Sequence, residues 1–327
     1  MKIFMACPAP AGSRKGNRVT ADRWAGILKS LANQVTIGQE YNGMTCDLLI
    51  ALHARKSYPA VRKFRRQNPG KPVIVTLTGT DLYREIRRSP AAQASLEAAN
   101  RLIVLQRAGI PELPKHLRSK ARVIYQSAER TRRRRYRSRA CFDVCVLGHL
   151  RAVKDPFRTA MALRFLPCTS RIRVTHLGQA LDATMEKRAR ALMARNGRYR
   201  WLGEVPRGKA RRILAASHLT VISSQMEGGA NVVSEALVDS VPVLASRISG
   251  NIGMLGPSYP GYFPVGYEQA LGALLHRAET NARFYRELKR RCVRRAKLLD
   301  PGREKQAWKK LIRDLQPVAD DGREKLG

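Results

Sequence analysis

The sequence predicts an α/β protein with two doubly wound parallel-sheet domains that face each other across a cleft. In the first half, short apolar runs alternate with amphipathic stretches, which is typical of a parallel sheet covered by helices. The same alternation restarts after a strongly basic segment near residue 130. A chain of 327 residues is long enough for two domains of about 150 residues each.

The first half contains six apolar runs with helical stretches between them. Strands are expected at 2–6, 35–38, 47–52, 73–78, 101–105 and 122–125, and helices at 17–32, 58–67 and 90–99. The segment 129–139 follows and carries seven arginines. Like charges this dense repel one another, so this segment predicts an exposed linker.

The second half repeats the pattern and ends in basic helices. Strands are expected at 143–150, 171–177, 199–202, 219–223 and 242–245, and helices at 155–165, 182–195, 207–216, 232–239, 268–277, 280–299 and 303–315. We therefore divide the chain into a domain over 1–128, the linker over 129–139 and a domain over 140–300. A C-terminal helix and tail over 301–327 are expected to pack back on the first domain.

Charge is the unusual feature of the composition. The chain has 62 Lys and Arg against 25 Asp and Glu, a formal net charge of +37, which attracts nucleic acid, anionic membranes or phosphorylated small molecules. The charge is spread along the whole chain and lacks the interleaved aromatics of a single-strand stacking surface. Specific nucleic-acid binding is therefore disfavoured. The six cysteines form no C-x-x-C pair, so reduced and mostly buried thiols are expected.

The N-terminal apolar run of about five residues is shorter than the roughly 7–15 residues of a signal-peptide core. No apolar run approaches the ~18 residues of a membrane helix. These features predict a cytoplasmic protein.

A glycine-bearing loop after the expected strand 219–223 is the strongest local signal. It leads into a helix, and such a turn presents bare backbone N–H groups at the positive end of the helix dipole, which suits a phosphate or diphosphate. Glu227 and Glu235 bracket it, and carboxylates so placed accept hydrogen bonds from sugar hydroxyls. The alternative is that both carboxylates are only structural. The loop consists of Gly228, Gly229, Ala230, Asn231, Val232 and Val233.

A pair of cations follows the first strand of the second half. His149 ends that strand, and Arg151 and Lys154 come next. Two cations aimed at a leaving diphosphate would stabilise the charge that grows on it. The alternative is that Arg151 and Lys154 only lie on a solvent-exposed face, as most cations do in so basic a chain. Asp155, followed by proline, is expected to cap the helix 155–165.

Small residues and cations also join the first strand to the first helix. Gly16 and Asn17 lie there among Arg14, Lys15 and Arg18, a set suited to a second anion. The loop matches neither the G-x-G-x-x-G pattern nor the Walker A pattern. This argues against a dinucleotide-dependent dehydrogenase or a P-loop NTPase.

Polar residues end two further strands of the first half. His53 follows the strand 47–52, a place where a histidine is more often structural than catalytic. Thr78, Thr80 and Asp81 end the next strand, where hydroxyls and a carboxylate can orient sugar hydroxyls. Asp81 could equally cap a helix, and the two roles are compatible. The chain has no Asp-x-Asp pair, so metal-independent binding with no cofactor is expected.

Together these pieces resemble the GT-B fold glycosyltransferases of the family-4 type, which have two Rossmann-like domains. The resemblance implies that Glu227 and Glu235 match a Glu-x7-Glu pair that contacts the sugar-nucleotide donor. It further implies that Arg151 and Lys154 bind the donor diphosphate, and that the backbone of 228–233 lies along the phosphates and sugar, with His149 also in the donor site.

Longer runs look like the selenosugar synthases of selenoneine biosynthesis, at 16–21, 46–55, 77–83, 146–151, 154–156, 226–237 and 259–266. This resemblance implies transfer from a UDP-sugar, UDP-N-acetylglucosamine, to selenophosphate, with release of UDP and then phosphate. It implies a catalytic group of His53, Asp81 and Glu227, in which His53 and Asp81 orient groups or stabilise charge. The implied acceptor-binding residues are Arg14, Lys15, Gly16, Asn17, Arg18, Thr78 and Thr80.

Two alternatives stay open. A family-4-type glycosyltransferase with a lipid or glycan acceptor would keep the donor residues but needs an apolar groove or an amphipathic anchor. A basic nucleic-acid-binding protein would explain the charge but not the paired glutamates and glycine loops. The preferred sugar nucleotide, the anomeric outcome, the cleavage of the Se–P bond and the oligomeric state are not encoded in these patterns.

Overall fold

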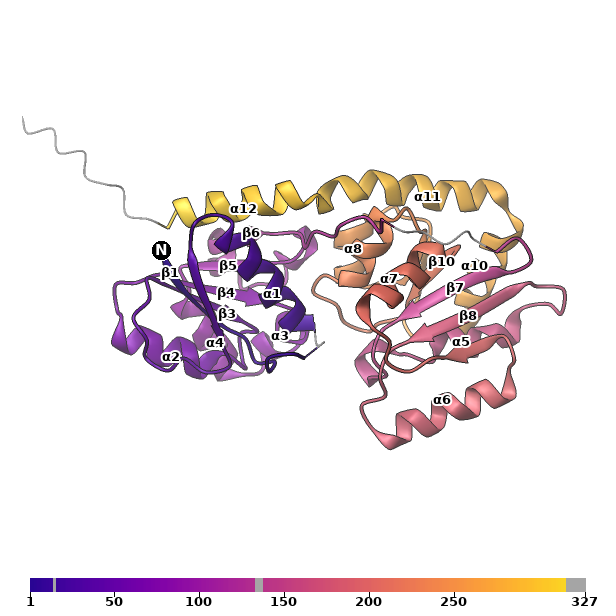
Figure 1. Cartoon of the computed structure of the whole chain (residues 1–327), viewed down its shortest axis with the longest axis horizontal. Coiled ribbons are helices and arrows are strands. Elements are labelled where there is room, and N and C mark those ends of the chain that lie inside the picture. Colours follow the sequence, from indigo (N-terminus) through magenta and orange to yellow (C-terminus); the bar gives the residue numbers. More distant parts are fainter. Residues whose placement is uncertain (14–15, 133–137, 316–327) are drawn as a thin grey trace, which may run out of the picture.

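The structure is a computed structural model that describes residues 1–13, 16–132 and 138–315. These residues form two six-stranded parallel sheets. Figure 1 shows the sheets side by side along the long axis. The strands of the first sheet are β1 (Lys2–Ala6), β2 (Gln34–Gly38), β3 (Leu48–Leu52), β4 (Val73–Leu77), β5 (Arg101–Val104) and β6 (Ala121–Val123). Their order is β2-β1-β3-β4-β5-β6, and the α/β prediction is confirmed.

Helices cover both faces of the first sheet. Every residue of β3 and β4 is buried, as expected for strands in the middle of a doubly covered sheet. The covering helices are α1 (Gly16–Lys29) on one face, and α2 (Tyr58–Gln67) and α4 (Pro90–Ala98) on the other, with α3 (Thr80–Tyr83) short and directly after β4.

The second sheet has the order β12-β11-β10-β7-β8-β9 and is also parallel throughout. Its strands are β7 (Phe142–Leu147), β8 (Ile172–Leu177), β9 (Tyr199–Trp201), β10 (Leu219–Ile222), β11 (Val243–Ser246) and β12 (Tyr262–Phe263). Its helices are α5 (Arg158–Ala162), α6 (Ala183–Arg195), α7 (Arg207–Ala216), α8 (Asn231–Val238), α9 (Ser249–Leu255), α10 (Glu268–Thr280) and α11 (Ala282–Ala296).

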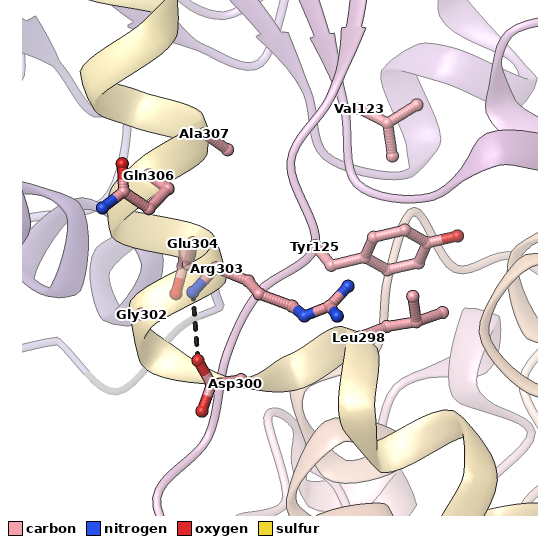
Figure 2. A pocket seen from close by; sticks show the side chains of 9 residues that line it. All are labelled: Val123, Tyr125, Leu298, Asp300, Gly302, Arg303, Glu304, Gln306 and Ala307. Carbon is pink, nitrogen blue, oxygen red and sulfur yellow. Dashed lines mark hydrogen bonds between the residues drawn. The ribbon is translucent and has the colours of Figure 1, made fainter.

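The last helix, α12 (Pro301–Arg313), crosses to the first sheet. The rings of Trp24 on α1 and Trp308 on α12 meet edge to face with 4.9 Å between centroids. In Figure 1, α11 and α12 run along one edge of the molecule and span both sheets. A pocket of about 400 Å³ lies beside the first turn of α12, between this helix, Tyr125 and Leu298 (Figure 2).

Part of the Arg-rich segment is tied down at its start. The Thr131 N–H and hydroxyl donate to the Asp239 carboxylate at 2.8 and 2.7 Å. Arg211 donates to the Glu129 carbonyl and to the same carboxylate. Residues 133–137 of the proposed linker lie outside the described residues, so its exposure and the domain boundaries stay predictions. The cysteines are free thiols; Cys168 is exposed, Cys141 is half-buried, and Cys7, Cys46, Cys145 and Cys292 are buried.

The expected cap at Asp155 is wrong. Asp155 ends a 3-10 turn with φ at +45°, and α5 begins only at Arg158. A residue before proline can cap a helix, as Ser89 and Asp300 do at α4 and α12, but the backbone of Asp155 is left-handed rather than extended, so the chain turns once more before α5 begins. Its carboxylate instead accepts from Arg158 Nε at 2.8 Å.

Candidate functional site

Loops from the two sheets meet where Gly228 packs on the turn after β4. A Cβ at Gly228 would lie 2.4 Å from the Thr78 carbonyl oxygen, and one at Gly229 would lie 2.7 Å from Leu105 Cβ. Only glycine permits this approach. The carboxyl end of β4 therefore touches the loop that follows β10, which brings two of the predicted site segments together.

Glu227 lies at the centre of the second-sheet part of the site. It is 8% exposed, and its Oε1 is 2.5 Å from Lys154 Nζ and accepts from the Ser224 hydroxyl at 2.6 Å. A Cβ at Gly250 would lie 1.8 Å from the Glu227 carbonyl oxygen, so α9 packs directly on this residue. The structure thus brings together a cation and a carboxylate that sequence analysis placed in separate motifs.

The start of α8 forms the backbone part of the site. Ala230 precedes the helix, and no side chain caps it. Helices leave their first N–H groups without intrahelical partners, and such groups bind anions when no side chain satisfies them. The loop 227–231 therefore has N–H groups that no side chain caps, close to Lys154, an arrangement that suits an anion.

A buried histidine, His176, supports the loop after β7 through a hydrogen bond. His176 is 1% exposed, and burial lowers its pKa from 6.5 to about 4. The neutral ring accepts from the Tyr199 hydroxyl at Nδ1 (2.8 Å) and donates from Nε2 to the Gly148 carbonyl (3.2 Å). The loop also packs on Gly178, where a Cβ would lie 2.0 Å from that carbonyl oxygen. Sequence analysis missed His176, because a histidine inside a strand gives no signal of its contacts.

His149 and Arg151 lie on this supported loop. His149 accepts the Gln179 N–H at Nδ1, at 3.2 Å. Arg151 is exposed, and its guanidinium has no hydrogen bond or ion pair with the described part of the chain. Arg151 is thus a cation available to a ligand, whereas Lys154 is already paired.

On the first sheet, His53 has an uncommon backbone conformation. Its φ is +77°, and left-handed geometry in a residue other than glycine is a strain that clusters at functional sites. The side chain is 4% exposed, with Nε2 3.4 Å from Thr80 Oγ1 and 3.8 Å from Glu85 Oε2. Its Nδ1 accepts the Lys56 N–H at 3.4 Å, which leaves the proton on Nε2.

Glu85 is a residue of this site that sequence analysis missed. Its carboxylate accepts from Arg55 Nε at 2.8 Å. Burial acts to raise the pKa of Glu85, but the Arg55 hydrogen bond and the charges of His53 and Arg55 outweigh it and lower the pKa. The Glu85 carboxylate thus lies 3.8 Å from His53 Nε2, the ring nitrogen that does not accept from Lys56. Nothing in the local sequence marks Glu85, because its partners lie 30 residues away.

Asp81 is completely buried, and both of its carboxylate oxygens accept hydrogen bonds from the backbone. Its carboxylate accepts from the N–H groups of Thr78 (2.9 Å), Gly79 (2.8 Å) and Ala54 (3.0 Å). These bonds join the turns that follow β3 and β4. The expected contact of Asp81 with sugar hydroxyls therefore has no support in this geometry, and the carboxylate instead fixes the turns that carry His53, Thr78 and Thr80.

Glu235 is also held within the protein. It lies on α8 at 7% exposure, 3.4 Å from Arg207 Nη2 and 3.6 Å from Arg211 Nη1. Burial raises the pKa of Glu235, and the charges of Arg211 and Arg207 oppose that rise. Arg207 is exposed, so Glu235 and Arg207 together present a polar pair at the edge of the loop.

The predicted acceptor loop is only partly described. Arg14 and Lys15 lie outside the described residues. Gly16 and Asn17 begin α1, and Arg18 Nε donates to Asp22 at 2.9 Å.

The described residues contain neither a metal site nor a membrane span. In that part of the chain, no group of three or more His, Cys, Asp or Glu side chains is arranged to hold a metal ion. No helix in the same ranges combines the length and apolar character that a membrane span requires.

The sequence profile of the family described as "Glycosyl transferases group 1" matches residues 133–298, just over half of the chain. The chain belongs to this family. The match covers the loop after β7 and the loop 227–231, so the second sheet of this group 1 glycosyltransferase carries the family's features. No curated protein sequence matches the chain.

Solved structures with the same fold are distant in sequence. Sucrose-phosphate synthase from Thermosynechococcus elongatus has a TM-score of 0.80 at 15% identity, covering 96% of this glycosyltransferase and 98% of that chain. Anabaena Alr3699/HepE, solved in complex with UDP and glucose, has a TM-score of 0.76 at 15% identity. The match covers 96% of this glycosyltransferase and 100% of that chain. A trehalose-phosphate synthase from Burkholderia vietnamiensis has a TM-score of 0.67 at 13% identity. The match covers 91% of this glycosyltransferase and 76% of that chain. These likenesses show the GT-B fold.

Proposed function

We propose that the protein transfers a sugar from UDP-N-acetylglucosamine to selenophosphate, forming a bond between selenium and the anomeric carbon and releasing UDP. The observation that carries the proposal is the contact of the loop 227–231 with the turn after β4. It places Lys154 and Glu227 on one side of a junction and His53 on the other. The residues that we assign to the donor and to the acceptor thus lie on loops of separate sheets that touch each other.

The donor half of the proposal assigns the diphosphate to the second sheet. The uncapped start of α8, Lys154 and the exposed Arg151 supply positive charge where the leaving diphosphate gains negative charge. Glu227, freed from Lys154 when the diphosphate binds, accepts hydrogen bonds from the sugar hydroxyls. Anabaena Alr3699/HepE, a protein of the same fold, was solved with UDP and glucose, which supports this assignment.

The acceptor half assigns a small anion to the first sheet. Arg55 and Lys56 follow His53 closely in the chain, and Arg18 lies on the first helix. Selenophosphate is an anion whose selenium is already nucleophilic near neutral pH, so a strong general base is not required. His53, with its proton on Nε2, donates to the anion and orients it, and Asp81 acts as a positioning residue through the backbone of both turns.

The chemistry balances in two steps. Selenium attacks the anomeric carbon, the bond from that carbon to the diphosphate oxygen breaks, and UDP leaves with the electron pair. Water then attacks phosphorus, the Se–P bond breaks, and the products are the selenosugar and inorganic phosphate.

An acceptor panel tests the proposal. UDP release from UDP-N-acetylglucosamine should depend on selenophosphate and should be absent with phosphate, because oxygen is the weaker nucleophile. Glycan and lipid acceptors form the other arm of the panel. UDP release with those acceptors and not with selenophosphate would replace the proposed acceptor while keeping the donor.

A further inference from the structure

An arginine of the first sheet reaches the loop proposed to bind the donor. Arg23 lies on α1 and donates from Nη2 to Asn231 Oδ1 at 2.8 Å, a bond between residues 208 positions apart. Asn231 is the first residue of α8, so this hydrogen bond ends on the helix start that offers its N–H groups to the diphosphate. The sequence predicts ligand contacts for the backbone of Asn231 but no role for its side chain.

Arg23 is itself held in place from two further directions. Its Nη1 donates to the Ser127 carbonyl at 2.6 Å, and its Nε lies 3.9 Å from Glu304 Oε1. Arg23 is mostly buried, with 19% of its side chain exposed. Two hydrogen bonds, from Nη1 and Nη2, and an ion pair at 3.9 Å fix the planar guanidinium in a way that a flexible lysine ammonium cannot reproduce, although Nε itself makes no hydrogen bond.

Glu304 anchors the arrangement to the C-terminal helix. Its side chain is 1% exposed, and it accepts from Trp24 Nε1 at 2.7 Å and from the Ser127 N–H at 2.9 Å, as well as from the Ser127 hydroxyl. Figure 2 shows Glu304 in the first turn of α12, near the segment that carries Tyr125. The contacts therefore run from α12 through Arg23 to the start of α8.

Nearby charges act on the same guanidinium. Besides Glu304, the charges of Arg207 and Glu235 reach Arg23, and burial is the largest influence lowering its pKa. A buried cation of this kind needs its acceptors, so Arg23 cannot leave Asn231 without losing hydrogen bonding. The donor loop is thereby connected to α1 and α12, which do not otherwise belong to the second sheet.

We propose that Arg23 is a positioning residue for the donor, holding Asn231 and the first turn of α8 in the arrangement that binds the UDP diphosphate. The inference rests on the proposed donor site at 227–233. In this role Arg23 touches no reacting atom. Its loss should weaken UDP binding by letting the first turn of α8 move.

The test compares UDP dissociation constants, by calorimetry on the full chain, for wild type, Arg23→Met, Asn231→Ala and the double variant. Each single change should weaken UDP binding about tenfold, as expected for a lost charge-assisted hydrogen bond. The double variant should be no weaker than the weaker single variant, because each single change already removes the Arg23–Asn231 hydrogen bond. Asn231→Ala leaves Arg23 with Ser127 and Glu304, and so keeps the test usable if Arg23→Met fails to fold.

A matched arginine–asparagine pair supplies the control. Arg65 donates to Asn100 Oδ1 and to the carbonyls of Ala98 and Lys71. It lies on α2, which Figure 1 shows on the side of the first sheet away from α8. Arg65→Met and Asn100→Ala should leave the UDP dissociation constant within twofold of wild type. Equal weakening in this pair would assign the effect to general loss of packing and overturn the proposal.

Hydrogen exchange without ligand separates this inference from the proposed function. The amides of Asn231, Val232 and Val233 should exchange faster in Arg23→Met than in wild type. If wild type does not bind UDP, the donor proposal fails, whereas faster exchange would still show that Arg23 positions the loop. Unchanged exchange and unchanged UDP binding in folded variants would overturn the role of Arg23.

Discussion

Lys154 and Glu227 form an ion pair with 2.5 Å between Nζ and Oε1, at the point where the loops after β7 and β10 meet. Both side chains are candidates for the same donor, one for its phosphates and one for its sugar. The pair gives each of the two groups a partner of opposite charge. Binding a diphosphate then exchanges one anionic partner of Lys154 for another.

Lys154→Met should lower kcat/KM for the UDP-sugar at least ~100-fold, because it removes charge stabilisation from the leaving diphosphate and leaves Glu227 without its cation. Steady-state kinetics of UDP release checks this. Lys187→Met, on the exposed face of α6, removes the same charge and should leave kcat/KM unchanged. Equal losses in both variants would contradict a specific role for Lys154.

Gly228→Ala should reduce turnover more than tenfold, because its Cβ would lie 2.4 Å from the Thr78 carbonyl and neither backbone can yield without separating the two loops. Gly26→Ala is the matched control. A Cβ there meets nothing within 4 Å inside α1, and alanine favours a helix interior by about 0.5–1 kcal/mol, so its Tm should rise with turnover intact. Wild-type turnover in Gly228→Ala would show that the contact does not matter.

Asp81→Asn should destabilise the fold by about 3 kcal/mol, because an amide offers one acceptor oxygen where the carboxylate serves three backbone N–H groups. Denaturant unfolding measures the change. Asp182→Asn, at the exposed N-cap of α6, should shift stability little, since asparagine caps a helix as well as aspartate does. A stable Asp81→Asn protein with lost turnover would instead restore a direct catalytic role.

His53→Ala should lower kcat with a smaller change in Tm than Asp81→Asn, because the ring is proposed to contact the acceptor. Glu85→Gln should have a weaker effect of the same kind, since it acts on the acceptor only through His53 and Arg55. The two variants are compared by kcat at saturating donor. Wild-type turnover in His53→Ala would remove His53 from the site.

The stability of the fold should fall as the pH drops from about 6.5 to 4. Burial lowers the pKa of His176 to about 4, so the unfolded chain binds a proton in this range that the folded chain does not. The lost stability is on the order of 3 kcal/mol. Unfolding free energies across this pH range should show a steeper slope for wild type than for His176→Gln, and equal slopes would contradict the assignment.

Much of the fold followed from the sequence because parallel strands are continuous apolar runs. The predicted ranges for β1, α2 and α7 coincide with the observed ones. The strand β12 escaped prediction because it has only two residues, and α9 because its run of small residues lacks a helical apolar period. Asp155 misled because the proline after it suggested a helix start.

The site was predictable in its motifs and not in its contacts. The glycine loop and the Arg–Lys spacing mark Glu227 and Lys154 locally, whereas Glu85, His176 and Arg23 act on residues 28 to 208 positions distant in the chain. Sequence patterns also do not reveal that the Asp81 carboxylate already accepts three hydrogen bonds from backbone N–H groups. Such pairings depend on how helices and sheets pack, which no local spacing records.

The most direct measurement is mass spectrometry of the products that the purified protein forms from UDP-N-acetylglucosamine and selenophosphate. The account predicts a selenium-bearing sugar together with equimolar UDP and phosphate, and loss of all three in Glu227→Gln. UDP formed without any selenium in the sugar product, or a selenosugar formed equally well by Glu227→Gln, would contradict it.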